Sequence, residues 1–174
     1  MTPISKLLVL LLFTLWPHGI FANDLIASAC DRTTYKALCR EILEPDPESH
    51  EATDVLGLVR VAIKNTGTNA TQLRDYVTQV AERNNDDNVL VECLRDCYDN
   101  YQNAADQLDN SFVPLQSKGY KDVNKMVITA KKDADSCEEG FKAQHRKSPL
   151  IDLSTTFNRL CSNILGLMNQ LPKH

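Results

Sequence analysis

The chain has 174 residues, 43% of them hydrophobic and 24% charged, and a formal net charge of −4 at pH 7. This length fits one ordinary domain, and a mildly acidic chain without a basic stripe argues against nucleic acid as its partner. Beyond the N-terminal apolar run, no segment is apolar enough to span a membrane, which takes roughly 20 residues.

The N-terminus has the pattern of a secretory signal peptide. Lys6 supplies a positive charge, residues 7–16 are apolar except for Thr14, and Ala22 suits the position before a cleavage site. We therefore expect residues 1–22 to be removed and the protein to be secreted into the extracellular space. An uncleaved N-terminal anchor is the alternative.

A short helical unit at residues 25–43 opens the remaining chain. It carries Cys30 and Cys39, and a local bridge between them would pin a segment that has little core of its own. The stretch Glu44-Pro45-Asp46-Pro47 then breaks the helix, because proline lacks an N–H donor and restricts the residue before it. We expect residues 23–51 to form an N-terminal arm.

Four longer segments follow, each with apolar residues at steps of three and four. Their expected ranges are 52–83, 88–110, 121–138 and 150–171. Thr53 is the expected N-cap of the first, Gly140 and Pro172 should end the third and fourth, and residues 113–119 read as a break. The fourth stripe consists of Leu150, Leu153, Phe157, Leu160, Ile164, Leu167 and Leu171. Such stripes need one shared core, which predicts an all-α, up-down-up-down four-helix bundle over residues 52–174.

All six cysteines follow the signal peptide, and an even number in a small secreted domain indicates disulfides. If the turn between the second and third long helices lies near Gln116, Cys97 and Cys137 fall at nearly equal heights. Cys93, one helical turn from Cys97, fits almost as well, so spacing leaves this choice open. We expect Cys161, and whichever of Cys93 and Cys97 does not pair with Cys137, to be free, partly buried thiols. A diagonal Cys93–Cys161 bridge is the alternative.

No pattern of an enzyme or of a cofactor or metal site is present. The phosphate-binding, dinucleotide, zinc-protease and serine-hydrolase motifs are all absent, and a metal or redox pair at Cys93 and Cys97 is disfavoured because no histidine is nearby. The carboxylates Glu138-Glu139 and Asp133 with Asp135 are expected on solvated helix faces. The histidines outside the signal peptide, none on an apolar stripe, are His50, His145 and His174.

Five segments follow one another along nearly the whole chain after the signal peptide. They are Cys30-x8-Cys39 with Leu43-Glu44-Pro45-Asp46-Pro47, Ala52-Thr53-Asp54-x-Leu56-Gly57-Leu58, Cys97-x3-Tyr101-x2-Ala104-x3-Leu108, Ser136-Cys137-Glu138-Glu139-Gly140-Phe141, and Arg159-Leu160-Cys161-Ser162-Asn163-Ile164-Leu165. Together and in this order, they resemble the plant invertase and pectin methylesterase inhibitor family.

The resemblance implies a disulfide-stapled four-helix bundle with an N-terminal helical hairpin extension, acting as an inhibitor and not as an enzyme. It also implies bridges Cys30–Cys39 and Cys97–Cys137. Cys161 matches a typically unpaired cysteine of the family, and Cys93 is outside the pattern.

The target is less clearly indicated. Many invertase inhibitors of the family carry Pro-Lys-Phe between the second and third bundle helices, whereas this chain has Ser117-Lys118-Gly119-Tyr120-Lys121-Asp122-Val123-Asn124 there. This stretch, like the Leu-Cys of the last helix, is more similar to the pectin methylesterase inhibitors. The resemblance implies that the second and third bundle helices cover the target's cleft. The interface residues that it suggests are Tyr120, Lys121, Asp122, Asn124 and Thr129.

Three other functions remain as alternatives: an inhibitor of acid invertase, a structural or storage protein of the cell wall, and a small ligand-binding helical protein. The sequon at Asn69 predicts N-glycosylation, and secretion in a plant places the protein in the apoplast. We expect a monomer or a weak dimer that binds no nucleic acid, membrane, metal or cofactor.

Overall fold

The computed structural model describes residues 18–172, and every regular element in that range is a helix. The predicted signal peptide lies outside the described residues except for positions 18–22, which belong to the first helix. None of the helices in this part of the chain is long and apolar enough to cross a membrane.

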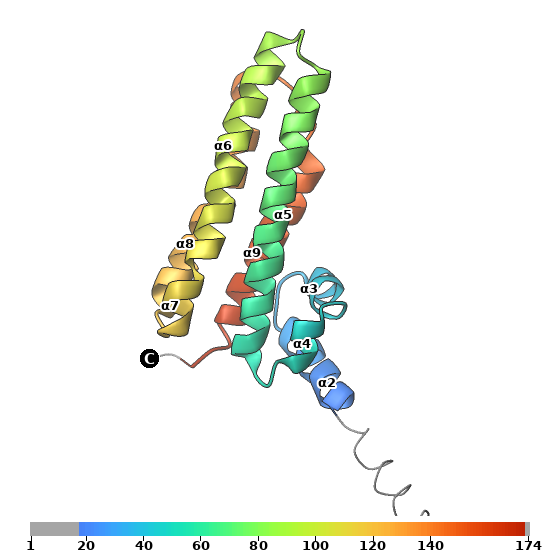
Figure 1. Ribbon diagram of the computed structural model, residues 1–174, viewed down its shortest axis with the longest axis vertical. Helices are drawn as coiled ribbons and strands as arrows, with labels where there is room; N and C mark the ends of the chain where they lie inside the picture. Colours follow the sequence, from blue (N-terminus) through green and yellow to red (C-terminus); the bar gives the residue numbers. More distant parts are fainter. Residues whose placement is uncertain (1–17, 173–174) are drawn as a thin grey trace, which may run out of the picture.

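The short helices form an N-terminal arm that lies at one end of the long ones. Their bounds are α2 His18–Cys30, α3 Lys36–Leu43 and α4 Pro47–Glu51. The arm packs on α5 and α9, beside the lower end of the bundle in Figure 1. The hairpin arm expected from the sequence is therefore present, with one additional helical turn after the proline break.

The four long helices form an antiparallel bundle, as predicted. They are α5 Val55–Arg83, α6 Asn88–Asn110, α8 Tyr120–Ala143 and α9 Ile151–Met168, and the short α7 Phe112–Gln116 lies between α6 and α8. In sequence order each long helix packs on the next, and α9 closes the bundle against α5 (Figure 1). The stripe predicted for α5 is buried throughout, including Thr66, whose hydroxyl donates to Ala62 O at 2.7 Å.

Several predicted boundaries are wrong for local reasons. Asp54 and not Thr53 caps α5, because its carboxylate accepts from Gly57 N–H at 2.9 Å and the helix begins one residue later. Gly140 does not end α8, because the helix continues for one more turn and thereby buries Phe141. The expected break at 113–119 contains α7, where Pro114 is tolerated within the first turn.

The fourth stripe is also corrected at one position. Leu153 is 40% exposed, and Ser154 takes its place in the core with 1% exposure. Its hydroxyl lies 2.7 Å from the Tyr101 hydroxyl and donates to Glu138 Oε1 at 2.5 Å. A buried polar network thus links α6, α8 and α9, and burial raises the pKa of Tyr101 to about 12.

Candidate functional site

The connection between α7 and α8 is a tightly closed turn. Gly119 N–H donates to Pro114 O at 2.8 Å and Lys118 N–H to Leu115 O at 3.2 Å, which together form a Schellman-type helix ending. Lys118 occupies the left-handed position of this motif with φ 60°, where glycine is usual. A Cβ on Gly119 would meet Pro114 at 3.3 Å. The turn therefore has a fixed shape and presents an exposed lysine.

Four of the predicted interface residues lie together directly after this turn. Tyr120, Lys121, Asp122 and Asn124 form the first turn and a half of α8 and line one groove. Lys121 and Asp122 are exposed, whereas Tyr120 is partly buried and packs against the core. The Asn124 Oδ1 atom is buried and accepts no hydrogen bond from the described residues.

The opposite wall of the groove comes from the end of α9 and the residues after it, which sequence reasoning missed. Met168, Asn169, Leu171 and Pro172 line it. These residues carry no motif, and they reach the groove only because α9 runs antiparallel to α8. Thr129, the fifth predicted interface residue, is absent from this groove; its hydroxyl donates to Lys125 O at 2.9 Å further along α8.

Of the four acidic residues considered as possible catalytic pairs, Asp135 and Glu139 are exposed as expected, whereas Asp133 and Glu138 are less solvated. Glu138 is half-buried and accepts hydrogen bonds from Ser148 at 3.1 Å and from Ser154. One carboxylate oxygen of Asp133 is buried, and burial raises the pKa of this group. Asp135 accepts from Asn158 at 2.6 Å. Each carboxylate thus has a structural environment of its own, and they do not face one another across a cleft.

The histidines are scattered, and within residues 18–172 no three His, Cys, Asp or Glu side chains are placed to hold a metal ion. His50 Nε2 lies 2.7 Å from Glu44 O, so it closes the proline break. His145 has φ 53° and ends α8 in the same kind of motif as Lys118 ends α7. His174 lies outside the described residues.

The cysteines form the two bridges implied by the resemblance. Cys30–Cys39 closes the arm, and Cys97–Cys137 joins α6 to α8. Cys93 and Cys161 are free and buried, and burial raises the pKa of both thiols, that of Cys161 to about 12.

The predicted glycosylation site, Asn69, lies in the middle of α5. It is half-buried, and its Oδ1 atom is buried without a hydrogen-bond partner among the described residues. Its glycosylation stays a prediction.

A helical bundle with two bridges fits the family whose sequence pattern matches residues 24–167, described as plant invertase/pectin methylesterase inhibitor. The chain belongs to this family. Its members are inhibitors of enzymes, so this protein acts by binding and not by catalysis.

Two relatives show how the family divides. The cell wall / vacuolar inhibitor of fructosidase 2 of Arabidopsis thaliana is 28% identical over 152 residues, covering 86% of this chain and 84% of that protein. The pectinesterase inhibitor of Actinidia deliciosa is also 28% identical, over 151 residues, covering 86% of this chain and 80% of that protein. Identity therefore does not separate the two targets.

A solved structure has the same fold. The crystal structure of mutant form A of a pectin methylesterase inhibitor from Arabidopsis gives a TM-score of 0.71 at 24% identity, covering 86% of this chain and 98% of that chain.

Proposed function

We propose that this protein inhibits pectin methylesterase by lying over the enzyme's active-site cleft and excluding the polymer. The observation that carries the proposal is the composition of the turn between the second and third bundle helices. Pro-Lys-Phe is absent there, and Gly119-Tyr120-Lys121-Asp122-x-Asn124 stands in its place. The turn is held by its own backbone hydrogen bonds, so little conformational entropy would be lost on binding.

The groove behind this turn offers the features of a binding site for a protein surface. Tyr120 supplies an aromatic side chain, and tyrosine is enriched among residues that dominate binding energy. Lys121 and Asp122 are exposed and of opposite charge, which suits the polar rim of an interface. Inhibition of this kind needs only that the bundle blocks access to the cleft, and it requires no reactive group.

Inhibition of acid invertase is the second candidate, because relatives with either target resemble this chain equally. A titration against both enzymes decides between them. Secreted, oxidised protein is added to a plant pectin methylesterase and to a plant acid invertase at mildly acid pH. We expect stoichiometric loss of demethylesterification alone. Loss of sucrose hydrolysis alone would overturn the proposed target, and inhibition of neither would favour a structural or storage role.

Tyr120 provides the test of the site. Tyr120→Ala is expected to weaken inhibition at least tenfold, or about 1.4 kcal/mol, by removing the aromatic anchor. Tyr76→Ala is the matched control, because Tyr76 is a 37% exposed tyrosine on α5, which contributes nothing to the groove. Equal inhibition by both variants, each with an unchanged helical circular dichroism spectrum, would show that the turn is not the interface.

The remaining proposals follow from the sequence. The signal peptide would direct the protein to the apoplast, where one inhibitor domain of residues 23–174 would meet its target as a monomer or weak dimer.

A further inference from the structure

A second groove, of about 410 Å³, lies between α5 and α6. No residue of α8 or α9 lines it, so it is separate from the groove at Tyr120. Its α5 wall includes Gly67, Thr71 and Arg74, its α6 wall includes Gln102 and Asp106, and Phe112 lies at one end.

Gly67 keeps this groove open, and the fold itself gives no reason for a glycine there. The residue lies in the interior of a 29-residue helix, where glycine is destabilising relative to alanine. No glycine of the described residues has positive φ, and a Cβ at Gly67 would meet only Leu108 Cβ, at an ordinary 3.7 Å. A missing side chain that neither backbone conformation nor packing demands points to something that approaches the helix from outside.

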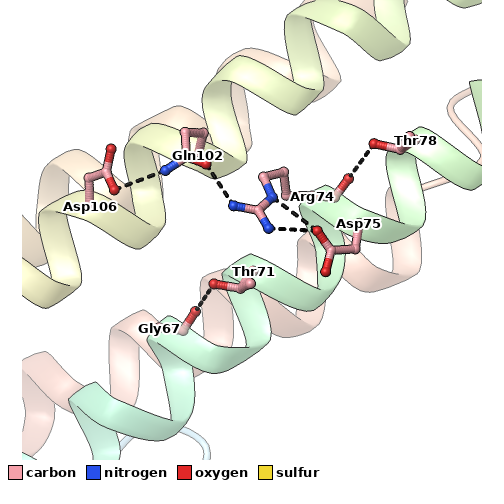
Figure 2. A network of polar contacts seen from close by, with 7 residues as sticks. All are labelled: Gly67, Thr71, Arg74, Asp75, Thr78, Gln102 and Asp106. Atoms are coloured by element: carbon pink, nitrogen blue, oxygen red, sulfur yellow. Dashed lines mark hydrogen bonds and ion pairs between the residues drawn. The ribbon is translucent and has the colours of Figure 1, made fainter.

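The polar groups of the groove are fixed by one another, as Figure 2 shows. Arg74 Nη1 donates to Gln102 Oε1 at 2.7 Å, and Gln102 Nε2 donates to Asp106 Oδ1 at 2.9 Å. Arg74 also donates twice to Asp75 Oδ1, at 3.0 and 2.7 Å. The Thr71 hydroxyl donates to Gly67 O at 3.2 Å, so its oxygen is left as an acceptor. This row of planar donors and acceptors is ordered before any ligand arrives.

The lining residues of the groove carry equal numbers of positive and negative charges. The positive charges are on Lys64 and Arg74, and the negative charges are on Asp106 and Asp109. Lys64 is in addition engaged by Glu48 at 2.6 Å and by Asp46 at 3.5 Å. The basic groups of the groove are thus already paired with carboxylates, so the groove disfavours a polyanion and can accept an uncharged ligand with many hydroxyl groups.

Phe112 adds the apolar element that such a ligand needs. Its ring is partly buried against the core and also lines the groove, and the Arg60 guanidinium lies 5.8 Å from the ring centroid. A sugar ring presents C–H groups on one face and hydroxyls at its edge. A chain of several sugar rings along the groove can therefore place one ring on Phe112 and the hydroxyls of another against the carboxylate, amide and guanidinium groups further along.

We propose that the α5–α6 groove binds an uncharged carbohydrate chain, with Gly67 allowing a sugar ring to approach the helix backbone. The chain can come from a methyl-esterified wall polysaccharide or from an N-glycan of a glycoprotein. This binding does not depend on which enzyme the protein inhibits.

The test uses the full secreted protein and two uncharged probes, a methyl-esterified oligogalacturonide and a high-mannose oligosaccharide, followed by calorimetry and by amide shifts in NMR spectra. We expect at least one probe to bind and to shift α5 and α6 amides around Gly67. Gly67→Leu, which fills the groove where a Cβ has room, should weaken that binding at least tenfold while leaving enzyme inhibition unchanged and the melting temperature no lower than that of the unchanged protein. Whichever probe binds identifies the source of the chain.

Gly140→Leu is the matched control, because a Cβ at Gly140 on α8 meets nothing within 4 Å and the residue lines neither groove. It should bind the probes like the unchanged protein. The proposal is overturned if neither probe binds, if Gly67→Leu binds as well as Gly140→Leu, or if a de-esterified oligogalacturonide binds more tightly than the uncharged probes. Loss of enzyme inhibition in Gly67→Leu would instead assign this groove to the target enzyme.

Discussion

The bundle and the N-terminal arm are stabilised in different ways. The bundle helices are 18 to 29 residues long and bury a continuous apolar stripe along their lengths. The arm helices α3 and α4 have only 8 and 5 residues, and each buries one or two side chains. A small segment of this kind cannot bury enough apolar surface to order itself, so other contacts must supply the difference.

Those contacts are the Cys30–Cys39 bridge inside the arm, polar contacts of Asp46 and Glu48 with α5, and hydrogen bonds to α9 and to Gln170 just after it. Asn163 pairs with the backbone of Tyr35 in both directions, accepting from its N–H and donating to its C=O, each at 3.0 Å. Gln170 donates to Ala29 O at 2.9 Å. Thr33 lies so close to α9 that a Cβ on Gly166 would meet it at 3.2 Å. Burial of apolar side chains thus stabilises the bundle, whereas a disulfide bridge and a few hydrogen bonds stabilise the arm.

The largest effect is expected in the bundle core. Phe157→Ala removes a fully buried ring that packs edge-to-face on Tyr101, with centroids 5.9 Å apart. We expect a loss of about 3–5 kcal/mol in the free energy of unfolding, measured by denaturant titration. Leu153→Ala, on the exposed face of the same helix, should change it by no more than about 0.5 kcal/mol. A similar loss in both variants would refute the description of α9.

Removing the arm's bridge should affect the arm alone. The double variant Cys30→Ser with Cys39→Ser frees a short loop, which the chain-entropy estimate values at about 2–3 kcal/mol. Hydrogen exchange should accelerate in α3 and stay slow in the middle of α9. The Cys161 thiol, fully buried and with its pKa raised to about 12, should remain unreactive to an alkylating agent. Rapid labelling of Cys161 would mean that arm and bundle unfold together.

The contact between the arm and the bundle is tested by Asn163→Ala. The variant leaves the Tyr35 N–H without its partner and removes one of two hydrogen bonds to the Tyr35 C=O, which still accepts from Cys39 N–H at 2.9 Å; arm docking should weaken by about 1–3 kcal/mol. Exchange of the Tyr35 amide and the stability of the arm report the change. Asn169→Ala, at an exposed position near the end of the same helix, should have little effect. If exchange at Tyr35 is unaltered, the paired hydrogen bonds do not hold the arm.

The smallest effect is expected at the turn between α7 and α8, which lies away from the contact between arm and bundle. Lys118→Gly places glycine at a position with left-handed backbone conformation and should stabilise the bundle by about 1 kcal/mol, whereas Lys118→Ala keeps the backbone strain. Thermal unfolding of the two variants measures the difference, and exchange in α3 should not respond. Equal melting temperatures would show that the turn stores no strain.

Periodicity predicted the bundle well because it reports burial directly. The range of α6 is as predicted, and the α5 stripe is buried at every expected position. The pattern fails where a polar side chain is buried. Ser154 lies in the core because Tyr101 and Glu138 form hydrogen bonds with its hydroxyl, and the preceding residue, Leu153, is exposed. Capping choices between neighbours such as Thr53 and Asp54 depend on backbone geometry that a sequence pattern does not contain.

The candidate site could be predicted only where it is continuous in sequence. The run from Tyr120 to Asn124 forms one wall of its groove, but Met168 and Leu171 on the facing wall come from the end of the last helix and the residues after it, far away in the sequence. The groove between α5 and α6 likewise combines residues from separate helices, and a glycine such as Gly67 within a helical pattern indicates by itself only a local loss of helix stability. Both grooves are products of helix pairing, which periodicity implies without specifying the rotation of each helix.

The pair of hydrogen bonds between Asn163 and Tyr35 also has a consequence for how the chain folds while it is being synthesised. Tyr35 leaves the ribosome 128 residues before the side chain that will hold it. During synthesis the arm therefore has its cysteines uncovered and no surface to dock on, while Cys30 and Cys39 are near enough in sequence to join without help from the rest of the chain. Local oxidation can precede docking, so that a segment synthesised early becomes the last part of the fold to be assembled.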